Sequence, residues 1–173
     1  FSGHPFVNVK TSFDSFFPIK MNKKIRKKLM DYYLKKLEDN PHLHDKVEFD
    51  ILFTCYDFSF DERSKELKNF GFINSEINYI KKILIEFTNE ILKNTPDILS
   101  EIENSISKLN KKRLVCKTNV KSYDDKLKNA ELLLKYCRNF GAIQFSAIAR
   151  LAFISATLLR GLHETHDIKK EKI

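Results

Sequence analysis

The chain has no tryptophan, and its 173 residues include only four glycines, four prolines and three cysteines. The four scattered glycines leave no glycine-rich loop to cradle a phosphate, and neither a P-loop nor a GxGxxG motif occurs. The HExxH zinc motif and the GxSxG nucleophile elbow are missing as well. These absences argue against nucleotide binding by this chain alone and against the reactions that those motifs carry.

The cysteines, Cys55, Cys116 and Cys137, contain no CxxC pair. That pattern favours a reducing compartment over a disulfide framework or a zinc site, so we expect a cytoplasmic protein. No run of about 18 apolar residues is apparent and 31% of the residues are charged, from which we expect no membrane-spanning helix and no membrane partner. The length suits one domain, and the opening FSGHPF, without a methionine or signal-like core, predicts a piece of a longer, multidomain protein.

A formal net charge of +8 invites a nucleic-acid interpretation, because clustered cations release counterions from phosphate backbones. The cations form two dense runs, residues 20–28 and 108–113, but neither is interleaved with the stacking aromatics or glycines of a known binding module. Solvated helix faces explain such runs, so we expect no nucleic-acid partner. A helical nucleic-acid binder remains an alternative.

Two stretches alternate between apolar and polar residues as half-buried strands do. In HDKVEFDILFTCYDFSF (residues 44–60), one parity carries Val47, Phe49, Ile51, Phe53 and Cys55, and the other carries polar residues such as Glu48 and Asp50. FVNVKTSFD (residues 6–14) alternates in the same way. We therefore predict two ribbon strands, one in residues 6–14 and one in residues 44–60, and we expect the latter to end or bulge near Asp57.

Most of the remaining chain has helical spacing. Apolar residues recur every three or four positions in residues 21–40, which stop before Pro41, in a short helix at residues 61–70 closed by Gly71, and in residues 73–94, which stop before Pro96. Further helices are expected over residues 97–112 and 123–138. The last predicted helix, residues 144–162, is apolar around most of its circumference, as a central core helix would be.

The fold class expected is α+β and predominantly α-helical, a single domain over residues 1–173 with helices packed on a small β-ribbon or sheet. Such a ribbon would bury its apolar face and leave a mixed-sign face open. This face could hold a zwitterion: Glu48 or Asp50 would accept from an α-ammonium, while Lys10 with Ser12 or Ser15 would donate to a carboxylate. A surface sheet with ordinary alternating charges remains the alternative.

Four other residues or motifs are considered as carriers of chemistry. Arg150 interrupts the apolar final helix, so it must pair with a carboxylate or bind an anionic ligand. Arg160 lies nearer the helix end and could reach solvent. The HETH motif at residues 163–166 has no third metal ligand nearby and is expected to fray, and Cys55 is expected to pack inward as a small apolar residue.

Three blocks together resemble a known family: GHPFVNVKTSFDSFFP (residues 3–18), LHDKVEFDILFTCYDFSFD (43–61) and NFGAIQFSAIARLAFISATLLRGL (139–162). They are similar to the middle region of phosphoenolpyruvate synthase-like, ATP-dependent phosphotransferases. Within this family the nearest resemblance is to bacterial enzymes that phosphorylate the amide nitrogen of L-glutamine for capsule phosphoramidate. The resemblance implies a relay in which ATP phosphorylates a histidine on a mobile domain that carries the phosphoryl group to an acceptor.

The resemblance also implies partners and cofactors. The full-length enzyme would use ATP and Mg²⁺, and flanking ATP-grasp and phosphohistidine domains would be partners in the same chain. This chain shows no match to the carrier-histidine motif or to the ATP-grasp metal ligands, so by itself it is expected to be inactive, to have no catalytic residue and to bind neither cofactor. Its expected role is to bind a small amino-acid acceptor or to dock the carrier domain. A noncatalytic helical scaffold, or an acceptor domain of the pyruvate or water dikinase type, is the alternative.

The residues expected to bind the acceptor lie in the blocks that carry the resemblance. We expect the cations to neutralise phosphate charge and Glu48 or Asp14 to orient the acceptor amine. The full predicted set is Lys10, Ser12, Asp14, Ser15, Lys46, Glu48, Thr54 and Arg150.

Overall fold

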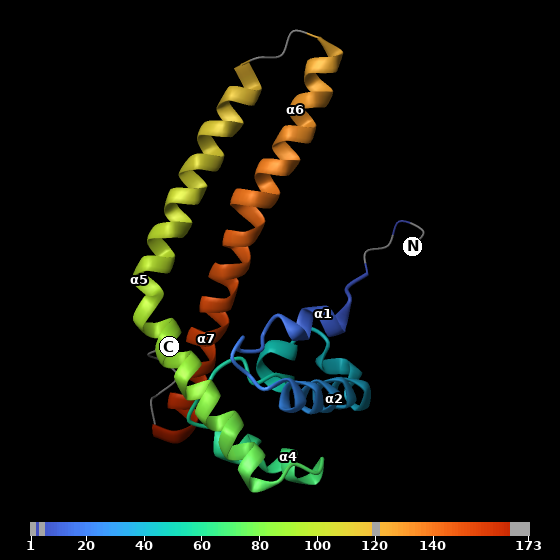
Figure 1. Ribbon diagram of the computed structural model, residues 1–173, viewed down its shortest axis with the longest axis vertical. Coiled ribbons are helices and arrows are strands. Elements are labelled where there is room, and N and C mark those ends of the chain that lie inside the picture. Colours follow the sequence, from blue (N-terminus) through green and yellow to red (C-terminus); the bar gives the residue numbers. More distant parts are fainter. Residues whose placement is uncertain (1–2, 4–5, 119–121, 167–173) are drawn as a thin grey trace. The chain divides into compact units, whose positions relative to one another are not determined.

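The computed structural model describes residue 3 and residues 6–118 and 122–166, and 81% of these residues are helical (Figure 1). No strand occurs among the described residues. The prediction of a predominantly helical protein is confirmed, whereas the predicted ribbon is wrong. The chain divides into two compact units, Phe1–Glu90 with Phe153–Ile173 (unit 1) and Ile91–Ala152 (unit 2).

Unit 1 begins with a short helix where the first ribbon strand was predicted. Helix α1 spans Val9–Asp14, and the side chain of Asn8 caps it by accepting a hydrogen bond from the backbone N–H of Thr11 at 3.0 Å. Phe13 packs edge-on against Tyr33 of helix α2, Lys23–Asp39, with 6.3 Å between ring centroids. Capping and this aromatic contact stabilise the helix, and Val7, which the alternation predicted on the buried face, is exposed.

The second predicted strand is replaced by tight helical turns and a buried loop. A 3₁₀ turn, η1, spans Pro41–Leu43, and a π-helical segment, η2, spans Val47–Ile51. The five residues after Asp50 are all buried, including Leu52 at 1% exposure and Thr54 at 4%. Alternation predicted those two on an open face. Because both parities are buried, the segment is a core loop and has no solvated side.

Two short helices then lead into a long one. Helix α3 spans Phe60–Arg63, α4 spans Lys65–Asn69, and Gly71 ends the turn at φ +91°, which confirms its predicted role as a helix terminator. The core of unit 1 is rich in aromatic side chains. Tyr33 lies at its centre, stacked on Phe17 at 5.7 Å and accepting a hydrogen bond from the backbone N–H of Phe53 at 3.0 Å.

Helix α5, Asn74–Thr118, runs without a break through Pro96, where the sequence predicted two helices. Proline lacks the N–H that would bond the carbonyl of Leu92, and its ring crowds that carbonyl, while the hydroxyl of Thr95 donates to the carbonyl of Ile91 at 2.8 Å. The next helices are also continuous. Helix α6, Tyr123–Tyr136, passes through a π-helical segment, η3, Cys137–Ala142, into α7, Ile143–His166.

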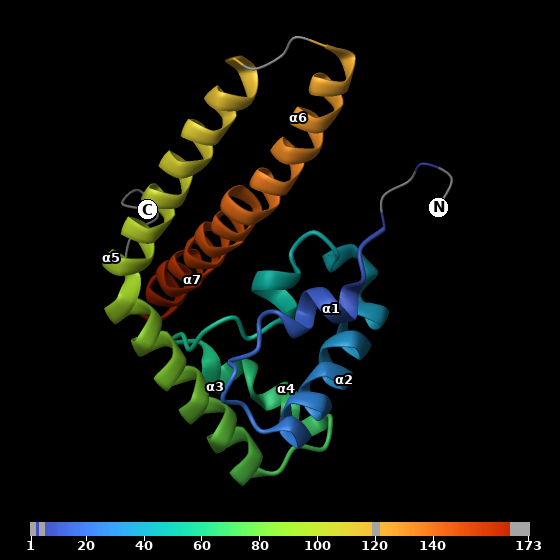
Figure 2. The same cartoon turned by 45° about the horizontal axis from the view of Figure 1, so that its top comes forward.

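Within unit 2 the second half of α5 runs beside α6 (Figures 1 and 2). The amide of Asn129 donates to the carbonyl of Cys116 at 2.7 Å, and that of Gln144 donates to the hydroxyl of Ser105 at 3.2 Å, which fixes an antiparallel pairing. Along α5, the non-exposed residues in 91–116 recur at alternating spacings of four and three, as in a coiled-coil seam. They are Ile91, Thr95, Ile98, Ile102, Ser105, Leu109, Lys112 and Cys116.

The last helix is not the fully buried core helix that its composition predicted. Phe145 is 74% exposed, and Ile143, Ile148 and Leu159 are exposed as well, whereas Ile154 and Thr157 are buried. By length and composition the helical stretch Tyr123–His163 could cross a membrane, with a mean hydropathy of 1.6 over 18 residues. This corrects the expectation that no such stretch exists, although core helices of soluble proteins pass the same test. Localisation stays a prediction.

Candidate functional site

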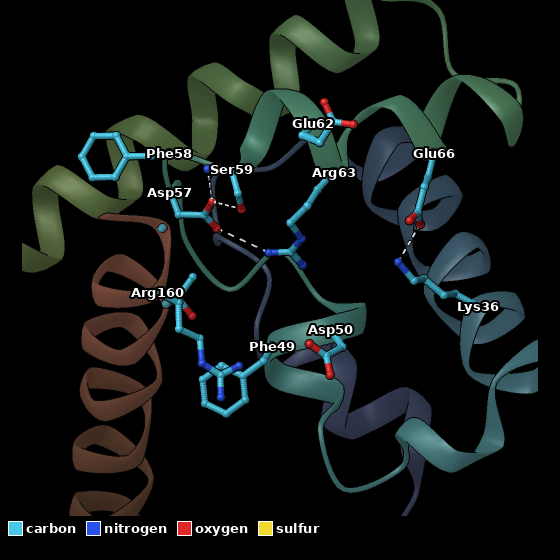
Figure 3. A pocket seen from close by; sticks show the side chains of 12 residues that line it. Lys36, Phe49, Asp50, Asp57, Phe58, Ser59, Glu62, Arg63, Glu66 and Arg160 are labelled. Atoms are coloured by element: carbon cyan, nitrogen blue, oxygen red, sulfur yellow. Dashed lines mark hydrogen bonds and ion pairs between the residues drawn. The ribbon is translucent and has the colours of Figure 1, made fainter. Parts of the chain in front are cut away.

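A pocket of about 520 Å³ in unit 1 gathers charged side chains from six segments of the chain (Figure 3). Lys36 comes from α2, Phe49 and Asp50 from η2, and the remaining residues from the loop after it, from α3 and α4, and from α7. Three cations and four carboxylates line the space. The full lining is Lys36, Phe49, Asp50, Asp57, Phe58, Ser59, Glu62, Arg63, Glu66, Thr157, Arg160 and Gly161.

Asp57 anchors one wall of the pocket. Its side chain is 2% exposed, and one carboxylate oxygen accepts hydrogen bonds from the backbone N–H and the hydroxyl of Ser59, at 2.7 and 2.5 Å. The other oxygen lies 3.4 Å from the guanidinium of Arg63, which also donates to the carbonyl of Leu52 at 2.8 Å. These contacts fix the loop and hold Arg63 in place, so both charges are structurally engaged.

On the opposite wall, Lys36 and Glu66 form an ion pair at 2.6 Å, and the hydroxyl of Tyr32 donates to the same carboxylate oxygen at 2.7 Å. Partial burial works to raise the pKa of Glu66, but hydrogen bonds from Lys36 and Tyr32 outweigh it, and the net pKa is lowered. Burial first, and then the bond to Glu66, raise the pKa of Tyr32 well above its ordinary value. Glu66 is therefore held as a carboxylate and Tyr32 as a neutral phenol at neutral pH.

Two opposite charges in the pocket remain available. Asp50, partly buried on η2, and Arg160 of α7 form no ion pair with any described residue. The guanidinium of Arg160 lies 4.1 Å from the ring centroid of Phe49. This cation–π contact orients the guanidinium while leaving its N–H donors uncommitted.

Polar and steric features of α7 complete the site. The hydroxyl of Thr157 is buried and has no hydrogen-bonding partner among the described residues, although Thr157 lines the pocket. Gly161 lies against the loop on the pocket wall, since a Cβ atom there would come within 3.2 Å of the backbone nitrogen of Phe58. Glycine in a helix interior is destabilising, but here it permits this close approach.

The pocket contains two ion pairs and two charged side chains that form no ion pair with a described residue. Figure 3 shows Arg63 extending toward Asp57, and Lys36 toward Glu66, whereas Asp50 rises from η2 and Arg160 stacks on Phe49. An available carboxylate, an available guanidinium and a buried hydroxyl without a partner suit a ligand that carries both an ammonium and a carboxylate.

The structure does not gather the predicted set of binding residues into one face. Lys10 and Asp14 of α1 line a separate basic depression with Lys23, Arg26 and Lys27, and Asp14 pairs with Arg26 at 2.7 Å. Ser12 lies on the same helix, and the hydroxyl of Ser15 donates to its carbonyl at 2.7 Å. None of these four residues lines the pocket described above.

The other four predicted residues are dispersed. Lys46 is exposed just before η2, and Glu48 lies within η2 beside Phe49. Thr54 is buried in the core loop. Arg150 is half-buried on the part of α7 that belongs to unit 2, where burial lowers its pKa, so it cannot be counted with a site of unit 1. Their predicted roles in binding stay predictions, but the shared ribbon face that was to unite them is absent because no ribbon forms.

Of the pocket residues, Asp50 was the one that sequence reasoning had already tied to an α-ammonium. Arg160 was interpreted as able to reach solvent, and it is exposed, but its place on the pocket was not predicted. Thr157 carried no sequence signal at all. Arg160 joins Phe49 across more than a hundred residues, so only the fold brings them together. A small hint was available in Gly161, since a glycine inside an apolar helix often marks a close backbone approach.

The described residues contain no group of three His, Cys, Asp or Glu side chains that could hold a metal ion. Cys55 is also no nucleophile candidate, because it is fully buried and burial raises its pKa to about 12.

No family model matches this chain, and neither a curated protein nor a solved structure matches it.

Proposed function

We propose that the pocket of unit 1 binds a small zwitterionic amino acid, and that this chain is the acceptor-binding part of an ATP-dependent phosphotransferase. The observation that carries the proposal is the pair of available opposite charges, Asp50 and Arg160, on one pocket. In this assignment Asp50 accepts from the α-ammonium, and Arg160 donates to the α-carboxylate.

The charges that line the pocket support a zwitterionic ligand over a simple anion or cation. The pocket already contains a compensated pair at each wall, Asp57 with Arg63 and Lys36 with Glu66. A simple anion would satisfy the exposed Arg160 and leave the partly buried Asp50 without a partner, which is costly, whereas a simple cation would leave the donors of Arg160 unused. A zwitterion satisfies both at once.

The acceptor proposed is L-glutamine, and its amide nitrogen is the group to be phosphorylated. The cavity volume lies in the range of small-molecule sites, and the buried hydroxyl of Thr157 provides an uncommitted donor and acceptor for a polar side chain. The class of reaction rests on the sequence resemblance to phosphoenolpyruvate synthase-like enzymes. In that scheme, flanking domains supply the phosphohistidine, and this chain supplies the acceptor.

Isothermal titration calorimetry with three ligands tests the charge assignment. L-glutamine has both charges, glutaramic acid lacks the α-ammonium, and L-glutaminamide lacks the α-carboxylate. Each deletion removes one hydrogen bond to a charged group, so we expect each analogue to bind at least roughly tenfold more weakly than L-glutamine. Equal binding of all three would contradict the assignment, and no heat with any of them would favour the scaffold alternative.

Two substitutions locate the binding. Asp50→Asn and Arg160→Gln should each weaken L-glutamine binding roughly tenfold or more, for the same reason as the analogues. Asp31→Asn on α2 and Arg113→Gln on α5 are matched controls, because both residues are exposed and lie outside the pocket. If the control substitutions weaken binding as much as the pocket substitutions, binding is a general charge effect and the site is elsewhere.

A further inference from the structure

Helix α6 presents an apolar stripe that nothing in the described chain covers. Tyr123, Leu127, Ala130, Leu134 and Cys137 follow one another at spacings of four, three, four and three residues. Tyr123, Leu127 and Leu134 are 77%, 63% and 73% exposed, and Ala130 and Cys137 are exposed too. This spacing is that of a coiled-coil seam, which is normally buried against a second helix.

The stripe is distinct from the face with which α6 packs inside unit 2. That inner face carries Asn129, which donates to the carbonyl of Cys116, and Tyr136, whose ring receives the ammonium of Lys112 at 4.5 Å. Each of these two residues directly precedes a stripe residue and therefore lies about 100° away from it around the helix. One helix thus has two heptad faces, and only one of them is used within the chain.

We propose that this stripe is a self-association surface on which α6 pairs antiparallel with α6 of a second copy of the chain. In the simplest register, Leu127 faces Cys137 of the second copy and Ala130 faces Leu134 of the second copy. The two-fold axis then passes close to residue 132, so each contact occurs twice. Large side chains face small ones across the seam, which allows close packing.

Charge at the border of the stripe selects the antiparallel arrangement. Asp124 and Arg138 each follow a stripe residue directly and lie fourteen residues apart on the same side of the helix. Neither forms an ion pair with any described residue. Antiparallel pairing places Asp124 of one copy opposite Arg138 of the other, twice, whereas in a parallel dimer these positions lie on opposite flanks of the seam and form no such pairs.

Glu131 occupies the same border midway between these residues and would approach its own counterpart near the axis. This repulsion occurs at a solvated edge and weakens the dimer without changing its direction. The assembly expected is therefore a reversible dimer that forms as protein concentration rises. The proposal concerns unit 2 alone and does not depend on the amino-acid pocket of unit 1.

Sedimentation velocity of the whole chain over a series of concentrations tests the association. We expect a monomer–dimer equilibrium for the natural sequence and a monomer at every concentration for Leu134→Lys. Leu99→Lys on α5 is the matched control, since Leu99 is also an exposed leucine of unit 2 but lies outside the stripe, and it should dimerise as before. Circular dichroism checks that both variants remain helical.

Charge reversal tests the direction of pairing. Asp124→Arg and Arg138→Asp should each raise the dimer dissociation constant at least tenfold, and the double variant Asp124→Arg/Arg138→Asp should restore it, because the two ion pairs re-form with exchanged signs. Asp124→Arg and the double variant share the loss of an acidic residue at the start of α6, so recovery in the double variant cannot come from helix stability.

The position of Cys137 gives an independent reading. In the antiparallel dimer the two Cys137 residues lie ~15 Å apart and do not cross-link under mild oxidation. Leu127→Cys places a thiol opposite Cys137 of the second copy and should give a cross-linked dimer. A strictly monomeric natural chain, a monomer that binds anionic vesicles through Leu134, or a Cys137-to-Cys137 dimer insensitive to charge exchange would each overturn the proposal.

Discussion

At the scale of single residues, Asp57 holds together one wall of the pocket. Its carboxylate is almost fully buried and holds Ser59 and Arg63, which in turn fixes the carbonyl of Leu52. A buried carboxylate with this many donors is stabilising only as long as each partner is present. The same network engages the guanidinium of Arg63, whereas Arg160 forms no ion pair with any described residue.

Asp57→Ala should lower the free energy of unfolding by about 3 kcal/mol, because it strands the guanidinium of Arg63 and the hydroxyl of Ser59. Urea denaturation followed by circular dichroism measures the change. Asp61→Ala is the matched control: Asp61 pairs with Lys81 at 2.7 Å, but its side chain is largely exposed, so its loss should cost about 1 kcal/mol or less. Equal losses for the two variants would show that Asp57 anchors nothing.

The sequence alone singled out only part of the candidate site. Acids next to apolar positions stand out in a short segment, so Asp50 could be named as a candidate to bind an ammonium, and that role stays a prediction. Arg160 could not be paired with Phe49, since the two are distant in the chain and an arginine near a helix end ordinarily reaches solvent. The hydroxyl of Thr157 lacks a partner among the described residues because of how the side chains pack, which the spacing of residues in the sequence does not predict.

At the scale of elements, helices with strong local signals were predictable. Helix α2 follows its stripe of apolar residues and ends before Pro41, and Gly71 terminates α4 at a positive φ. These features depend on neighbours within a few positions. The strand prediction for residues 44–60 was wrong because core packing, and not the local pattern, decides which side chains are buried there. Apolar and polar residues do alternate in this segment, but residues of both parities are buried, so the alternation does not show which side faces solvent.

The helix end predicted before Pro96 was also wrong, and the stability of α5 around this proline can be tested. A proline inside a helix costs about 3 kcal/mol relative to alanine, yet α5 continues through it because the seam residues on both sides remain packed. Pro96→Ala should therefore raise the stability of unit 2 by about 1 to 3 kcal/mol. Native-state hydrogen exchange of the amides in residues 91–105 measures this locally.

Ser100→Ala, at an exposed position one turn further along α5, is the control and should raise local stability by only about 0.5 kcal/mol. If Pro96→Ala slows exchange no more than Ser100→Ala does, the helix is already interrupted at Pro96 in solution. The sequence-based prediction of two separate helices would then be correct after all.

At the scale of the whole molecule, the two units differ in how they are built. Unit 1 has the aromatic core and the pocket, and unit 2 is a two-helix coiled coil with a second, uncovered seam on α6. The sequence predicted one domain on a sheet because no linker or glycine-rich break separates the units. The division occurs inside continuous helices, α5 and α7, where composition does not change.

The central claim is that an amino acid binds between η2 and the end of α7 in unit 1. The most direct measurement is a titration of L-glutamine into the isotopically labelled chain, followed by ¹H–¹⁵N NMR. We expect saturable shift changes at the backbone amides of residues 49–63 and 157–161, and none in residues 91–116. No changes at millimolar ligand, or changes centred instead on residues 8–15, would contradict the assignment of the pocket.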